Sequence, residues 1–233
     1  MKKVIMMAAM MLAVISASAQ GRFEPGTLTL QPRIGGTAAQ MTNMPKFQTS
    51  KLGYDGDVDA TVTGGGLVGL ELEYQLTERL SFAAGANWAN AGSGWQDTDF
   101  KTSEGETVKM RDMKIETEYV FVPMTVNFYV ARGLALKTGV QLGFLTKGKA
   151  KTSLSAGSDG VNRKEEIDVD IKDGLNKFDV CIPVGLSYEF KKPFVIDARY
   201  NIGLSKVNKE SIDGAKDTRN GIFTLTFGYK FSL

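Results

Sequence analysis

Apolar and polar residues alternate with a period of two over most of the chain, and the last thirteen residues show the pattern most clearly. From Gly221 to Leu233, one set of alternate positions carries four aromatic and two leucine side chains. The other set is small or polar apart from Ile222. Because alternate side chains of a β-strand point to opposite faces, this stretch predicts a strand with one apolar face and one polar face.

Seven earlier segments show the same alternation, and six of them form three hairpins joined by tight turns. The predicted strands are residues 26–33, 68–76, 80–88, 119–130, 134–144, 178–190, 194–204 and 221–233. The second and third hairpins align without a gap at an offset of 60 residues, and the first aligns with the second at an offset of 54. Such repetition indicates one structural unit used several times. The polar segments 41–62, 89–118, 146–176 and 205–220 are predicted as long loops.

Short turns on one side and long loops on the other are typical of small membrane barrels. The pattern predicts an all-β fold, a closed antiparallel up-and-down transmembrane β-barrel of about eight strands with short periplasmic turns and long extracellular loops. Its apolar face would contact lipid. The alternative is a soluble secreted carrier of the lipocalin kind, with the apolar face turned inward around a small ligand. A terminal row of aromatic side chains favours the membrane, because an apolar edge in water promotes aggregation.

The N-terminus has the three parts of an export signal. Lys2 and Lys3 precede an apolar run from Val4 to Ile15, and small residues lead to a predicted cleavage between Ala19 and Gln20. We therefore expect residues 1–19 to be a signal peptide and residues 20–233 to be one barrel domain. The apolar run is shorter than the roughly 20 residues that a spanning helix needs. The expected location is the bacterial outer membrane.

The predicted non-lipid face carries nine charged side chains of both signs. We expect them to form a pairing network that fills the lumen, because eight strands enclose only enough space for side chains. A conducting or ligand-binding lumen is the alternative, although a selective pore would more naturally show one dominant sign. The nine residues are Arg33, Glu71, Glu73, Lys137, Asp179, Glu189, Asp197, Arg199 and Lys230.

Aromatic residues of the lipid phase gather near the strand ends, as expected for interfacial girdles. Trp88 lies near a long-loop end, and the others lie near the short-turn ends. Those others are Tyr74, Phe82, Phe128, Tyr188, Phe190, Phe194, Tyr229 and Phe231. Three prolines, Pro32, Pro123 and Pro183, fall inside predicted strands, where we expect bulges or bends.

Composition gives little support to catalysis or nucleic-acid binding. The signal peptide removes Lys2 and Lys3 and no acidic residue, so 26 of the 28 basic residues remain to face 26 acidic ones. A neutral chain lacks the basic excess that nucleic acids require. There is no histidine, which is the commonest general base and zinc ligand, and the single cysteine, Cys181, is interpreted as a small lumen filler. We predict no enzyme activity, no cofactor and no metal site.

Several segments resemble the PorT-like outer-membrane β-barrel proteins of Gram-negative bacteria. The resemblance covers most of the mature chain and implies a membrane barrel without catalytic residues. It further implies that the last strand, with Phe227, Tyr229, Phe231 and the terminal Leu233, is the signal recognised by the barrel-insertion machinery. The matching segments are Tyr119–Phe128, Leu136–Phe144 with Gly139 and Gly143, Phe178–Phe190, Val195–Tyr200 and Phe227–Phe231.

The first functional hypothesis is therefore a non-catalytic outer-membrane barrel with a structural or surface-interaction role carried by its long loops. Expected partners are outer-membrane lipid and lipopolysaccharide, the insertion machinery during biogenesis, and a protein partner at the extracellular loops. The second hypothesis is a narrow pore or an accessory barrel for secretion, and the third is the soluble carrier described above.

Overall fold

The computed structural model describes residues 23–44, 46–48, 57–101, 107–158, 161–190, 194–209 and 217–233. The predicted signal peptide, its cleavage site between Ala19 and Gln20, and the predicted turn at 191–193 lie outside these residues. None of the helical residues in the described ranges belongs to a helix long and apolar enough to cross a membrane.

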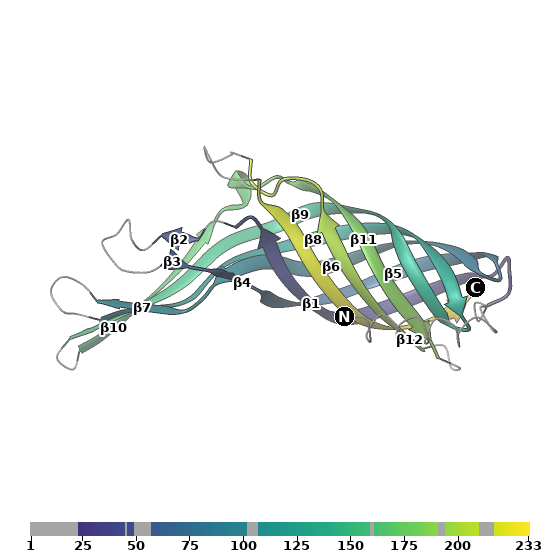
Figure 1. Ribbon diagram of the computed structural model, residues 1–233, viewed down its shortest axis with the longest axis horizontal. Coiled ribbons are helices and arrows are strands. Elements are labelled where there is room, and N and C mark those ends of the chain that lie inside the picture. Colours follow the sequence, from purple (N-terminus) through teal and green to yellow (C-terminus); the bar gives the residue numbers. More distant parts are fainter. Residues whose placement is uncertain are drawn as a thin grey trace, which may run out of the picture.

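Eight antiparallel strands form a ring that makes up the body of the molecule (Figure 1). Each ring strand pairs with the ring strand that follows it in the chain. The last one, β13 (Arg219–Tyr229), pairs back onto the first, β1 (Leu28–Thr42), with Arg33 opposite Gly228. A short strand, β14 (Phe231–Ser232), continues the pairing with β1. The predicted up-and-down barrel is confirmed. The ring consists of β1 (Leu28–Thr42), β5 (Thr63–Thr77), β6 (Leu80–Trp95), β8 (Thr107–Ala131), β9 (Leu134–Ser158), β11 (Phe178–Glu189), β12 (Phe194–Gly203) and β13 (Arg219–Tyr229).

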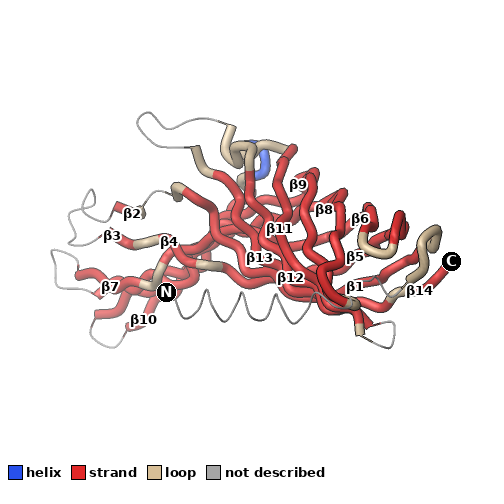
Figure 2. Tube along the Cα trace, turned by 45° about the vertical axis from the view of Figure 1, so that its right-hand side comes forward, coloured by secondary structure: helices blue, strands red, loops and turns tan. Residues whose placement is uncertain are grey.

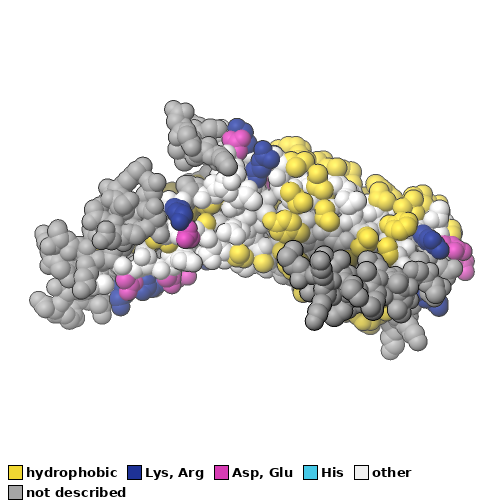
Figure 3. Space-filling model, in the orientation of Figure 1, with side chains coloured by type: hydrophobic (Ala, Val, Ile, Leu, Met, Phe, Trp, Pro, Cys, Tyr) yellow, Lys and Arg dark blue, Asp and Glu magenta, His cyan; other side chains and the backbone are white. Residues whose placement is uncertain are grey.

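The two faces of the ring differ as the alternation predicts. Outward-facing side chains are apolar and exposed; Leu225 in β13 is 51% exposed and Val184 in β11 is 48% exposed. Inward-facing side chains are mostly polar and buried, and Glu71 in β5 is only 1% exposed. Figure 3 shows the apolar side chains gathered over the ring. A soluble carrier requires the reverse orientation, so that alternative is wrong.

Two of the predicted loops consist largely of strand. Strands β8 and β9 are 25 residues each, and their outer parts extend past the ring together with the end of β6. Added strands lengthen this sheet: β4 (Ala60–Thr61) on β6, β7 (Thr98–Lys101) on β8, and β10 (Val161–Asp170) on β9. We call this extension the projection; it forms one end of the molecule, and strand makes up most of the described chain (Figures 1 and 2). A separate pair, β2 (Phe47–Gln48) and β3 (Asp57–Val58), and a short 3-10 helix, η2 (Lys172–Gly174), complete the described elements.

The prediction of loops at 89–118 and 146–176 was wrong for a physical reason. Alternation of apolar and polar residues marks a strand only where one face meets hydrocarbon or a core. In the projection, charged residues of neighbouring strands pair with one another instead, as Lys149 does with Asp168 at 2.8 Å. Two register shifts, between Arg111 and Lys114 and between Glu118 and Tyr119, also interrupt the phase.

The three prolines lie within strands, but the expected bulges do not form, because the strands keep the same register on both sides of each proline. Instead, pairing with one of the two neighbouring strands is interrupted beside each proline. Pairing between β6 and β8 stops beside Pro123, and pairing between β9 and β11 stops beside Pro183. The break between β13 and β14 falls opposite Gln31 and Pro32. Proline has no N–H to donate, so the ladder loses bonds there without gaining a residue.

Candidate functional site

The centre of the lumen is filled by an ion cluster built from four strands. Arg33 of β1, Glu71 of β5, Lys137 of β9, and Asp197 and Arg199 of β12 all occupy inward positions and are buried. We call these five residues the central cluster. Alternation places each side chain inside, and closure of the ring brings residues that are far apart in the sequence into contact.

Every charge of the central cluster has opposite partners. The Lys137 ammonium lies 3.0 Å from Glu71 and 2.9 Å from Asp197. The Arg199 guanidinium lies 2.7 Å from both carboxylates. Arg33 also pairs with Glu71, and its second nitrogen lies 3.2 Å from Asp197. Three cations thus hold two carboxylates between them, and such paired, hydrogen-bonded charges can stay ionised away from water.

A second ion cluster lies nearer the short turns. The Lys230 ammonium lies 2.8 Å from Glu73 and also pairs with Glu189. The Tyr129 hydroxyl lies 2.7 Å from Glu73 and 2.6 Å from Glu189, and Ser81 donates a 2.6 Å hydrogen bond to Glu73. We call these five residues the turn-end cluster. The turn-end cluster has one cation and two carboxylates, and the central cluster has three cations and two carboxylates. The net charge of the two clusters together is therefore zero.

Asp179, the ninth predicted lumen charge, lies apart from both clusters. Its carboxylate accepts hydrogen bonds from Asn220 at 2.8 Å, from the Cys181 thiol at 3.3 Å and from Ser205. Asn220 also lies within 3.4 Å of the Tyr119 hydroxyl. Cys181 is fully buried and fills lumen space beside this carboxylate.

Buried apolar side chains gather at the end of the lumen nearest the projection. We call this group the mouth cluster. Tyr119 and Phe121 stack within it, with ring centroids 5.1 Å apart. The lumen therefore contains paired charges along its length and an apolar layer at one end. The members of the mouth cluster are Ala39, Met41, Leu67, Ala89, Ala91, Tyr119, Phe121, Leu145, Leu175, Val207 and Ile222.

Sequence reasoning identified the charged members of the lumen but missed its uncharged ones. Tyr129, Ser81 and Asn220 donate or share the hydrogen bonds that complete the clusters. Tyr129 and Ser81 lie at inward positions of predicted strands, so the same alternation could have identified them. Asn220 lies one residue before the predicted strand 221–233. Among the residues with described coordinates, no three His, Cys, Asp or Glu side chains are grouped to hold a metal ion.

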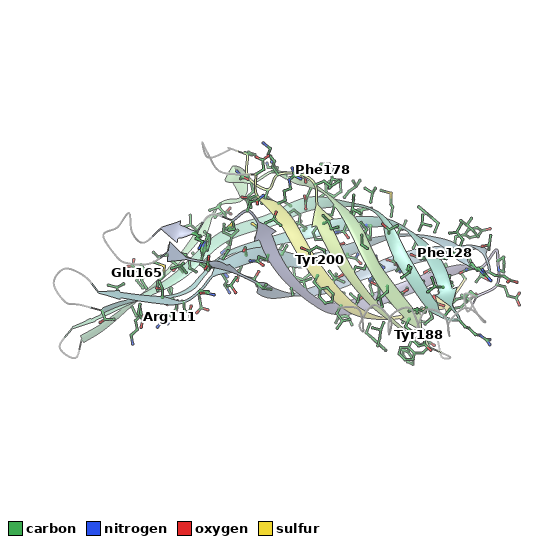
Figure 4. All side chains as sticks on the ribbon, in the orientation of Figure 1. Arg111, Phe128, Glu165, Phe178, Tyr188 and Tyr200 are labelled. Atoms are coloured by element: carbon green, nitrogen blue, oxygen red, sulfur yellow. The ribbon has the colours of Figure 1, made fainter. Side chains whose placement is uncertain are left out.

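Aromatic side chains lie on the outer face near the ends of the ring. Figure 4 shows Phe128 and Tyr188 at the short-turn end and Phe178 at the end nearer the projection. The aromatic residues of the C-terminus lie on this face too. Phe194 contacts Phe227 and Tyr229 with centroid distances of 5.3 and 5.2 Å, and Tyr229 contacts Phe231 at 4.6 Å. Leu233 is 69% exposed. Their role as an insertion signal stays a prediction.

Comparison with known proteins gives one family match and several similar solved structures. Residues 18–209 match the family described as outer membrane protein beta-barrel domain. The attachment invasion locus protein Ail of Yersinia pestis is 18% identical, with a TM-score of 0.44 over 90% of this chain and 100% of that one. Neisserial surface protein A is 14% identical, with a TM-score of 0.41 over 88% and 97% of the two chains. No curated protein sequence matches the chain.

Proposed function

Because the chain belongs to the family of outer-membrane β-barrel domains and lies in the bacterial outer membrane, we propose that it is a non-conducting anchor that presents the projection at the cell surface for interaction with another macromolecule. The narrower resemblance to PorT-like proteins stays a prediction. The observation that carries the proposal is the combination of a filled lumen with two strands of 25 residues.

The filled lumen supports a barrel without transport. The central and turn-end clusters occupy the interior with paired charges, and the mouth cluster adds a layer of buried apolar groups near one end. An ion that crossed the lumen would have to separate several buried ion pairs. Breaking one such pair costs about 3–5 kcal/mol. This supports an anchor over the alternative of a narrow pore.

The length of β8 and β9 supports a surface role. A tilted strand needs about 9–11 residues to cross the bilayer. The outer parts of β8, residues 107–118, and of β9, residues 146–158, are therefore free to form the projection, which extends about 40 Å at 3.3 Å per residue. An anchor alone requires no such extension, so we assign the interaction surface to the projection. Arg111 and Glu165 lie on it (Figure 4).

We also propose that the chain is not an enzyme. The chain contains no histidine, and its lumen carboxylates are buried and held by cations, hydroxyls or amides. A buried carboxylate that is already paired with cations, hydroxyls or amides is poorly placed to take up a substrate. The role of an accessory barrel for secretion is compatible with this proposal, because it too would use the projection as a binding surface.

Labelling of single cysteines tests the orientation that the proposal requires. We expect Glu165→Cys, on β10, to react with a membrane-impermeant maleimide on intact cells. Arg132→Cys, in the β8–β9 turn, should react only after the outer membrane is permeabilised, because short turns face the periplasm. Both positions are exposed, and Cys181 is buried and adds no background. Labelling of Arg132→Cys alone on intact cells would contradict the proposal.

A further inference from the structure

Strand β10 gives the projection one long edge that is open to another chain. It pairs along residues 161–170 with β9, and within the described part of the chain no strand pairs with its other side. Strand β11 pairs with the same side of β9 nearer the ring, and its other neighbour, β12, ends at Gly203 without pairing with β10. Figure 1 shows β10 at the far end of the projection. Such an edge presents about five backbone N–H groups and five carbonyl groups.

The half of β10 nearer the ring has two different faces. One carries three carboxylates in succession, and the other carries two β-branched apolar side chains. Asp168 on the first face pairs with Lys149 of β9 at 2.8 Å. On the second face, Val169 is 50% exposed although the projection lies outside the hydrocarbon. Residues 165–170 include four acidic residues and no basic one. The three carboxylates belong to Glu166, Asp168 and Asp170, and the two apolar residues are Ile167 and Val169.

The backbone of β10 does not prevent another strand from pairing with this edge. Its sequence has no proline, and its register against β9 is unbroken over residues 161–170. Proline and bulges are two common ways of protecting an exposed edge, and charge is a third. Here the carboxylates disfavour an apolar or acidic strand, whereas a strand with basic side chains beside them gains cross-strand ion pairs. The edge is therefore selective for charge.

A second copy of this chain does not suit the edge. Two barrels in one membrane share the direction of the membrane normal, so their β10 strands would run parallel. Symmetric parallel pairing would bring Glu166 and Asp168 of one copy beside the same residues of the other. Like charges that face each other across a strand pair are destabilising. The charge of residues 165–170 thus favours a partner of different sequence.

We propose that the free edge of β10 binds an extended segment of another protein in which basic and apolar side chains alternate. The segment adds one strand to the projection. Its backbone pairs with β10, its basic side chains lie beside Glu166, Asp168 and Asp170, and its apolar side chains cover Ile167 and Val169. This inference rests on the proposed surface role of the projection and specifies the chemistry of its partner.

A synthetic peptide of sequence Lys-Val-Lys-Val-Lys-Val-Lys, with blocked ends and a fluorescent label, is the probe. Fluorescence anisotropy measures its binding to the full-length barrel in phosphatidylcholine nanodiscs, and we expect saturable binding that empty nanodiscs do not show. The same peptide N-methylated at its valines and inner lysines keeps its charge but loses its backbone donors. It should bind at least about thirtyfold more weakly, because some three hydrogen bonds are lost.

Variants of the barrel locate the binding edge. Glu166→Gln together with Asp168→Asn should weaken binding roughly fivefold, because the peptide lysines lose two opposite charges. The matched control is Asp97→Asn with Asp99→Asn, which removes the same charge at the opposite edge of the projection, where both carboxylates pair with Arg111. It should change the Kd less than about twofold, since salt screens exposed charges at that distance. Heat-modifiable gel mobility verifies that each variant is folded.

Equal binding of the N-methylated peptide would show that charge alone attracts the probe, and would overturn the inference. So would a lack of saturable binding, or an equal loss in the two double variants. Ready formation of disulfide-linked dimers by Glu165→Cys within one membrane would assign the edge to a second copy and would also overturn it. Peptide binding in nanodiscs does not depend on which side of the membrane the projection faces, so labelling on intact cells tests the proposed surface role separately.

Discussion

Replacement of Glu71 with glutamine is expected to destabilise the folded barrel by about 3–5 kcal/mol, because it breaks a buried charge network from one side. Glu71 contacts Arg33, Lys137 and Arg199, and its removal leaves these three buried cations with Asp197 alone. Urea unfolding of the protein in lipid vesicles measures the change in the free energy of unfolding.

The matched control for Glu71 is Asp59→Asn. Asp59 pairs with Lys46 at 2.9 Å, but both side chains are 59% exposed. An exposed ion pair contributes about 0–1 kcal/mol, so this variant should unfold almost as the native protein does. Equal, small effects of both substitutions would show that the central cluster does not stabilise the barrel.

Replacement of Leu225 with arginine should cost about 2–4 kcal/mol, because it places a charge against hydrocarbon near the bilayer midplane. Leu225 lies in the middle of β13, opposite Gly36 of β1 and Ala198 of β12, with its side chain outward. The same vesicle unfolding assay measures the effect.

The matched control for Leu225 is an outward-facing residue at a different depth in the membrane. Leu204 is also outward-facing, but it follows the last residue of β12 at the end nearer the projection. Leu204→Arg should cost only about 0–1 kcal/mol, as charges near the interface do. If the two arginine variants were equally stable, Leu225 would not face the centre of the hydrocarbon.

The alternation of apolar and polar residues was enough to predict the ring and its two faces. It placed Leu225 outside and Glu71 inside, because a strand that separates lipid from a polar lumen must alternate at nearly every position. It did not identify which charges meet. Lys137 and Asp197 are 60 residues apart, and only closure of the ring and the stagger of its strands bring them within 2.9 Å.

The projection was not predictable from the same signal. Above the membrane both faces of β8 and β9 meet water or other strands, so Lys114, Glu116 and Lys149 stand where apolar residues would otherwise mark a strand. The bulges expected at the prolines are absent for a different reason. A bulge adds a residue, whereas Pro123 and Pro183 remove a hydrogen bond and leave the register unchanged. The period of the hydrophobic pattern does not show that a strand continues above the membrane. Nor does it show whether a proline adds a residue or only removes a hydrogen bond.

The current through the refolded barrel in a planar lipid bilayer tests the central claim most directly. If paired charges and the mouth cluster fill the lumen, protein that shows the gel mobility of the folded form should pass no steady current at 100 mV of either sign, a voltage worth about 2.3 kcal/mol per elementary charge. Reproducible single-channel steps from the same folded preparation would mean that the lumen is open, and would contradict the account.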